Sequence, residues 1–172
     1  MATKMPSALL FLLVTSLLHV TNAQSTTNHL GARLHLRCDN GYALGLMTSH
    51  HENKDRRYTF DCKADVGGHR SCWWSPYVNY FTERINFNCP FRSVLAGVAS
   101  YYNDSVDDRR WKFLCCLTPK KLPSCSWSSF LNRLDGHVNY KVPRGRVFVG
   151  IYSYYNKYYK DRQWRLLNCK IH

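Results

Sequence analysis

The residues of this chain that could bind an anion recur at a fixed interval. An Asp-Arg pair, with an aromatic residue two positions after the arginine, begins at Asp55, Asp108 and Asp161, 53 residues apart. The arginines are Arg56, Arg109 and Arg162. A guanidinium group makes paired, charge-assisted hydrogen bonds to carboxylate or sulfate groups, so exposed arginines would form a threefold set of anion-binding donors. The alternative is a structural role, with the Asp, the Arg and the aromatic ring packed inside, and recurrence in equivalent places favours it.

Tyrosines and lysines interleave in residues 152–160, which makes this segment a second candidate ligand surface. Its candidate residues are Tyr154, Tyr155, Lys157, Tyr158 and Lys160. Flat rings can stack on sugars or on collagen prolines, and ammonium groups can pair with sulfate. Alternatively, every second tyrosine lines the core and the others cover a strand. The equivalent residues 103–108 are acidic, so we expect any such site not to be threefold.

The sequence has no pattern typical of an enzyme. It carries neither a Gly-x-Ser-x-Gly motif nor a phosphate-binding loop. His50 and His51 could suggest a metal site, but adjacent side chains of a strand point to opposite faces. We therefore expect no catalytic residue, no metal and no cofactor.

The N-terminal segment indicates a secreted protein, and the charge indicates the kind of partner. Residues 1–23 resemble a signal peptide, with Lys4 before the apolar run 7–20 and a small-residue cleavage site before Gln24. The remaining residues, 24–172, suffice for one domain with a core, and no other segment is apolar enough to span a bilayer. The formal net charge of +13 implies an acidic partner, such as a sulfated glycan, an anionic surface or nucleic acid.

The 53-residue interval divides this domain into three repeats, at about residues 30–65, 72–118 and 125–170. The first repeat lacks an opening Cys-Trp segment and is two residues shorter between Cys38 and Asp55. In the second repeat we expect strands near residues 73–80, 84–88, 94–102 and 109–117, and before the first repeat a loose tail at 24–29. We find no helix pattern. The fold class that follows is all-β and disulfide-rich, a pseudo-threefold repeat of short antiparallel strands, trefoil- or prism-like, with a sandwich still open.

All eight cysteines follow residue 23, and secretion favours disulfide bonds. The repeats indicate the partners, because partners are lost together. One pair of positions holds cysteines in the first two repeats and becomes Val142 and Asn168 in the third. A second pair holds cysteines in the last two repeats and is missing from the first. The predicted bonds are Cys38–Cys62, Cys72–Cys116, Cys89–Cys115 and Cys125–Cys169.

Three Asp-Arg-x-Trp/Tyr strands ending in cysteine, an adjacent Cys115-Cys116 and intervening Cys-x-Trp segments together resemble the dermatopontin family, over about residues 36–170. The resemblance implies a secreted, non-enzymatic adhesion or matrix protein. Members interact with collagen, fibronectin, small proteoglycans, heparan sulfate and cell-surface receptors, and some invertebrate members are lectins or occur in mineralised matrices. Vertebrate members are acidic and have one more cysteine pair. The basic charge therefore places this chain nearer the invertebrate haemagglutinin and cell-aggregation-factor branch.

We thus expect an extracellular protein whose partners are acidic glycans or proteoglycans, matrix proteins of the collagen or fibronectin type, and cell surfaces, but not nucleic acid. Haemagglutination and a homo-oligomer would fit such a role. Two alternatives stay open, a structural matrix component without a discrete sugar site, at a mineral surface or elsewhere, and a cationic defence protein. Asn103, in the sequence Asn103-Asp104-Ser105, is the predicted N-glycosylation site.

Overall fold

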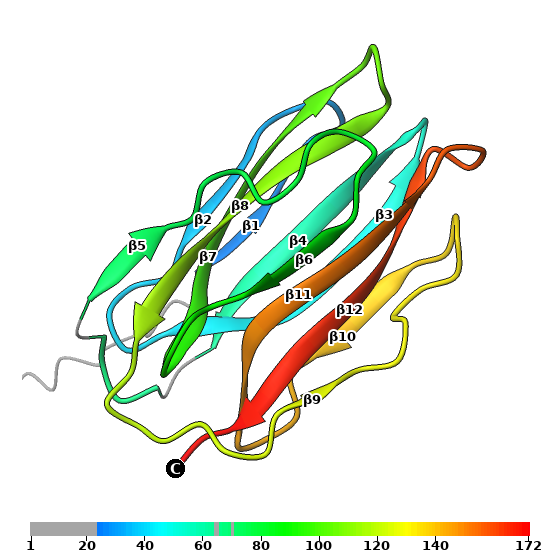
Figure 1. Ribbon diagram of the computed structural model, residues 1–172. Coiled ribbons are helices and arrows are strands. Elements are labelled where there is room, and N and C mark those ends of the chain that lie inside the picture. Colours follow the sequence, from blue (N-terminus) through cyan, green and yellow to red (C-terminus); the bar gives the residue numbers. More distant parts are fainter. Residues whose placement is uncertain (1–23, 64–65, 70) are drawn as a thin grey trace, which may run out of the picture.

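The computed structural model describes residues 24–63, 66–69 and 71–172 (Figure 1). The predicted signal peptide lies outside the described residues. Within them the regular secondary structure consists of strands, and there is no helix that could cross a bilayer. The strands are β1 Ser25–Thr27, β2 Leu34–Arg37, β3 Ala43–Glu52, β4 Asp55–Lys63, β5 Cys72–Trp74, β6 Ile85–Asn88, β7 Ser93–Asn103, β8 Asp108–Leu117, β9 Ser126–Trp127, β10 Val138–Lys141, β11 Arg146–Asn156 and β12 Asp161–Lys170.

Each repeat supplies one long hairpin, and each hairpin forms the middle of a four-stranded antiparallel sheet. The strand orders are β1-β4-β3-β10, β5-β8-β7-β2 and β9-β12-β11-β6. In each of these orders the first three strands belong to one repeat, and the fourth strand comes from a neighbouring repeat. Thus β2 of the first repeat joins the second hairpin, β6 of the second joins the third, and β10 of the third joins the first. The exchange of strands closes into a ring.

Three separate four-stranded sheets correspond to the prism-like arrangement among the expected alternatives. Figure 1 shows that the long strands of the three sheets, although antiparallel to their neighbours, all lie along about the same axis of the molecule. The all-β, disulfide-rich fold class is confirmed. The expectation of a loose tail at residues 24–29 is wrong, because residues 25–27 pair with β4 as β1.

The hairpin tips account for the two residues missing from the first repeat. There the chain turns at Asn53 and Lys54, with φ angles of 50° and 71°, as a tight type I′ turn requires. The other two hairpins use the four-residue turns 104–107 and 157–160. The strands on either side keep their equivalence in all three repeats.

A bulge at the same level of each hairpin anchors the exchanged strand. In the second hairpin the register shifts between Leu95 and Gly97, and the carbonyl of Ala96 accepts a hydrogen bond from the N–H of Cys38 at 2.8 Å. Gly97 lies so close to β2 that a Cβ atom there would be 2.7 Å from the carbonyl oxygen of Leu36. Equivalent 2.8 Å hydrogen bonds follow β6 and β10.

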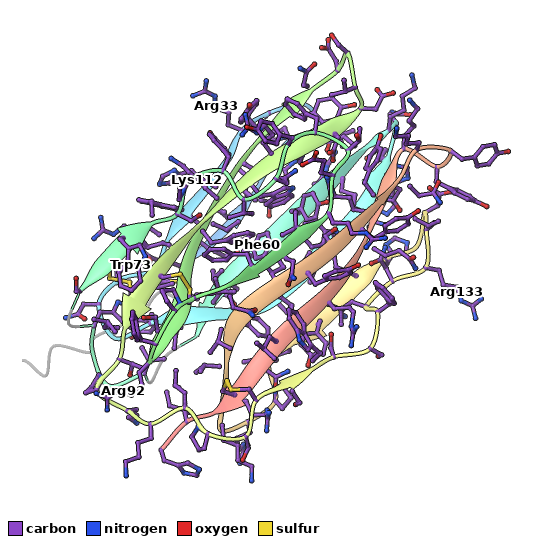
Figure 2. The ribbon with its side chains drawn as sticks, in the orientation of Figure 1. Arg33, Phe60, Trp73, Arg92, Lys112 and Arg133 are labelled. Carbon is purple, nitrogen blue, oxygen red and sulfur yellow. A yellow bond between two sulfur atoms is a disulfide. The ribbon has the colours of Figure 1, made fainter. Side chains whose placement is uncertain are left out.

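Three aromatic rings, one from each repeat, meet at the centre of the core. Tyr58, Trp111 and Trp164 are no more than 2% exposed, and each contacts the other two edge to face, with ring centroids 4.8 to 5.7 Å apart. This geometry places the positive edge of one ring on the negative face of the next. Phe60, labelled in the interior in Figure 2, packs against the same cluster.

Four disulfide bonds lie near the end of the sheets that is opposite the hairpin tips. They are Cys38–Cys62, Cys72–Cys116, Cys89–Cys115 and Cys125–Cys169, the pairs that comparison of the repeats predicts. Cys115 and Cys116 take different partners because they lie on opposite faces of β8. Cys115 belongs to the cluster with Trp111, and Cys116 to a small outer cluster with Leu114.

Candidate functional site

The Asp-Arg motifs form a closed ring of ion pairs, in which each arginine binds the aspartate of another repeat. The Nε and Nη2 atoms of each guanidinium both donate to one carboxylate, at 2.5 to 2.7 Å. The pairs are Arg56 with Asp161, Arg109 with Asp55, and Arg162 with Asp108. The ring therefore follows the same cyclic order as the exchange of strands.

The ring is buried and its groups have further partners. No side chain in it is more than 5% exposed. Each arginine also donates to a backbone carbonyl of a neighbouring repeat, as Arg109 does to Ala32 at 2.9 Å. Each carboxylate accepts a backbone N–H, as Asp55 does from Gly31 at 2.9 Å.

These contacts correct one expectation about ligand residues. Arg56, Arg109 and Arg162 cannot act as a surface triad for a ligand, because their side chains are buried and each binds a carboxylate inside the protein. Burial of a charged group is tolerated only when it is paired and hydrogen-bonded, and the ring meets this condition. The Asp-Arg motif therefore has a structural position, in which it joins one repeat to the next.

Near each of these arginines, an asparagine side chain makes two hydrogen bonds to the strand backbone. The side-chain amide of Asn79 donates to the carbonyl of Arg109 at 3.0 Å and accepts from the N–H of Trp111 at 3.0 Å. Asn28 and Asn132 make the same two hydrogen bonds in the other repeats. Asn28 thus holds in the first repeat the position that Asn79 and Asn132 hold in the other two.

Two tyrosines cover the ion-pair ring at the hairpin tips. Arg109 lies 5.6 Å from the ring centroid of Tyr102, and Arg162 lies 5.3 Å from that of Tyr155. Burial, followed by the nearby Asp108 and Asp107 carboxylates, raises the pKa of Tyr155 to about 12. Tyr155 is 5% exposed and donates its hydroxyl to backbone carbonyls, so it is not the surface ligand residue that the sequence suggested.

Of the other candidate ligand residues in residues 152–160, three lie at the surface and one forms an ion pair. Tyr158 is 87% exposed, Tyr154 is 38% exposed, and Lys157 is exposed. Together with Arg84 they line a shallow groove at the tip of the third hairpin. Lys160 instead forms an ion pair with Asp107 at 3.4 Å. This segment therefore keeps three of its five candidate ligand residues at the surface.

A larger group of cations and rings lies on the outer face of the sheet β5-β8-β7-β2, where the sequence predicted no site. The ammonium of Lys112 lies 5.3 Å from the ring centroid of Trp74 and 5.7 Å from that of Tyr77. The guanidinium of Arg110 lies 4.9 Å from the centroids of both Tyr77 and Tyr80. The available signal was the alternation of β8, which directs Arg110 and Lys112 outward between buried neighbours.

The third repeat carries a related group on its own sheet. Arg165, the equivalent of Lys112, lies 5.8 Å from the ring centroid of Trp127 and 5.6 Å from that of Phe130. These aromatic residues are the equivalents of Trp74 and Tyr77. Cations held over rings are thus a feature of two sheet faces.

Comparison with known proteins agrees with this architecture. The family profile described as Dermatopontin matches residues 28–172, which is nearly the whole of the described chain. The chain belongs to the dermatopontin family. No solved structure matches it.

Relatives within the dermatopontin family bear several names. The chain is 29% identical to "Hemagglutinin/amebocyte aggregation factor" of Limulus polyphemus, over 88% of this chain and 91% of that protein. It is 31% identical to "Millepora cytotoxin-1" of Millepora dichotoma, over 88% of this chain and 69% of that protein. It is 28% identical to the dermatopontin of Biomphalaria glabrata, over 81% of this chain and 96% of that protein. Dermatopontins are non-enzymatic proteins of the extracellular matrix, and the names of the relatives point to matrix, adhesion or aggregating roles.

Proposed function

We propose that this protein is a secreted, non-enzymatic adhesion protein of the extracellular matrix that binds acidic glycans, proteoglycans or matrix fibres. The observation that supports this best is the outer face of the sheet β5-β8-β7-β2. Cations there lie among partly exposed rings, and none of the described residues that line the hollow between them is acidic. Rings can stack on sugars and cations can pair with sulfate or carboxylate groups. The net charge of +13 acts in the same direction at longer range.

Three further elements belong to this proposal. Residues 1–23 act as the secretory leader. Asn103, at the end of β7, carries an N-linked glycan; its side-chain oxygen accepts the N–H of Ser105 at 2.9 Å, as in an exposed turn. Agglutination of cells follows if one molecule, or an oligomer, presents more than one binding surface.

The test is binding to immobilised heparin and to collagen fibres at physiological salt, together with agglutination of erythrocytes. We expect retention on heparin that weakens as salt rises, because screening reduces the attraction between exposed charges. Competition by one free acidic sugar would indicate a discrete site. Failure to bind heparin, any acidic glycan of an array, or matrix fibres would refute the proposal.

A second function, attack on anionic membranes, is favoured by one relative, which is named a cytotoxin. The same preparation is tested with dye-loaded vesicles of phosphatidylglycerol and phosphatidylcholine. Dye release from the anionic vesicles without heparin binding would favour this second function over adhesion.

A further inference from the structure

One hollow on the outer face of the sheet β5-β8-β7-β2 is lined by basic side chains and tyrosine rings. Its floor is Ala99 of β7, which pairs with His35 on β2 and with Lys112 on β8. Residues paired directly across strands share one face, so His35 and Lys112 rise on either side of the small alanine. The rings of Tyr77 and Tyr101 form a wall, edge to face, with centroids 5.2 Å apart.

The size of the hollow is suited to one sugar ring. Its volume is about 230 Å³. This is less than the roughly 300–1,000 Å³ of a pocket that encloses a whole small molecule. A polysaccharide could therefore place one residue in the hollow and continue over the surface on both sides.

The charge of the hollow is positive. Arg33, His35 and Lys112 line it, and Arg33 and His35 are exposed. Figure 2 shows Arg33 and Lys112 on the same side of the molecule, away from Phe60 in the interior. Lys112 contacts the rings of Trp74 and Tyr77, and among the described residues no carboxylate lies within ion-pair distance of it. Its ammonium therefore keeps donors for an external anion.

The other two sheets show what makes this hollow different. In the third repeat the position of Ala99 is taken by Tyr152, whose ring centroid lies 6.5 Å from that of Trp127 and 6.3 Å from that of Phe130. A large ring thus stands where the second repeat has its alanine floor. In the first repeat the paired positions are Thr48 and Thr59, with neither a cation nor a ring. The equivalent position thus holds a small side chain in the second repeat, a large ring in the third and a small polar side chain in the first.

We propose that the hollow over Ala99 binds one anionic sugar residue, a uronate or a sulfated hexose, of an acidic polysaccharide. Lys112, with Arg33 and His35, takes the sulfate or carboxylate, and Tyr77 and Tyr101 contact the apolar face of the sugar ring. The small side chain of Ala99 confines the site to the second repeat. This inference rests on the proposed adhesion to acidic glycans and assigns that adhesion a location.

The decisive experiment uses the protein's own third repeat as a guide. Ala99→Tyr fills the hollow as Tyr152 does, without changing the charge, and Tyr152→Ala opens the equivalent position. The disulfide-bonded wild type and both variants are titrated calorimetrically with a heparin tetrasaccharide, and with polyphosphate as an anion that has no sugar ring. Near-ultraviolet circular dichroism checks that each variant keeps its fold.

We expect Ala99→Tyr to weaken tetrasaccharide binding by at least about tenfold, because the site for the ring is lost, while polyphosphate binding changes less than about twofold. Tyr152→Ala should raise the stoichiometry for the tetrasaccharide. In a second comparison, Lys112→Gln should weaken tetrasaccharide binding about tenfold, since a charge-assisted hydrogen bond is lost. Lys141→Gln removes the same charge from an exposed position of β10 and should have less than about a twofold effect.

The outcomes separate this inference from the general proposal. If the wild type binds the tetrasaccharide and Ala99→Tyr binds it equally well, the hollow is not the site, and adhesion to acidic glycans stands without it. If Lys112→Gln and Lys141→Gln weaken binding equally, the attraction is diffuse and the inference is also overturned. If the wild type binds no acidic saccharide, both proposals fall.

Discussion

The ring of ion pairs leads to a sharp prediction, because two adjacent arginines of β4 have opposite environments. Arg56 is 2% exposed and makes two hydrogen bonds to Asp161, one to Ser49 and one to the carbonyl of Gly136. Arg57 is 47% exposed and has one ion pair, at 3.6 Å, with Glu52. The same substitution at neighbouring positions therefore compares a buried pair with an exposed one.

We expect Arg56→Met to reduce the free energy of unfolding by about 3–5 kcal/mol, since removal of one partner leaves the other charge buried. Asp161 would keep two backbone donors, the N–H groups of Asp135 and Arg162, but no cation. Arg57→Met should cost less than about 1 kcal/mol, as exposed pairs do.

Urea unfolding of the oxidised protein, followed by tryptophan fluorescence, measures both effects. With an m-value of about 2 kcal/mol/M, a loss of about 4 kcal/mol moves the midpoint by about 2 M. The Arg57→Met midpoint should move by less than about 0.5 M. Equal shifts for the two variants, or a loss below about 1 kcal/mol for Arg56→Met, would refute the view that the ring holds the repeats together.

Three other predictions concern the core and the repeats. Because burial keeps Tyr155, and likewise Tyr58 and Tyr102, protonated above the pH near 10 at which an unfolded tyrosine releases its proton, the contribution of these tyrosines to the free energy of unfolding should be level below about pH 10 and fall as the pH rises toward 12; urea titrations with phenolate absorbance measure this. The double variant Val142→Cys with Asn168→Cys should form a fifth disulfide at the position equivalent to Cys89–Cys115 and add about 3.5 kcal/mol on the chain-entropy estimate, which peptide mapping and urea unfolding would detect. Gly97→Ala should lose about 1–3 kcal/mol in the same assay, since its Cβ would overlap β2, and an unchanged midpoint would contradict the close approach.

The sequence predicted much of the fold because its repeats are nearly identical in length. Positions that are equivalent in the sequence occupy equivalent places in the three sheets, so loss of cysteines at Val142 and Asn168 indicated which cysteines are partners. The alternation of β8 likewise separated Cys115 from Cys116.

The same equivalence could not reveal which repeat supplies each partner. A period of 53 residues is unchanged whether Arg109 binds Asp108 of its own repeat or Asp55 of the preceding one, and the structure has the second arrangement. Exchange of β2, β6 and β10 between sheets is hidden for the same reason.

The sequence did not predict the aromatic surface on the sheet β5-β8-β7-β2, because strand β5 is shorter than expected. Residues 73–80 were expected to form one strand, which would send alternate rings to opposite faces. Strand β5 ends at Trp74, and after it the hydroxyl of Ser75 accepts the N–H of Phe113 at 3.0 Å. Beyond this interruption, Tyr77 reaches the same side as Trp74, over Lys112.

The cyclic exchange of strands determines how the protein responds to proteolysis. A cut that released the third repeat would at once deprive β3 of its neighbour β10, leave Arg56 without Asp161, and leave Asp108 without Arg162. The remaining fragment would expose a bare strand edge and two uncompensated charges, and such an edge is a template for pairing with other chains. Clipped molecules should therefore accumulate as aggregates rather than as smaller folded domains.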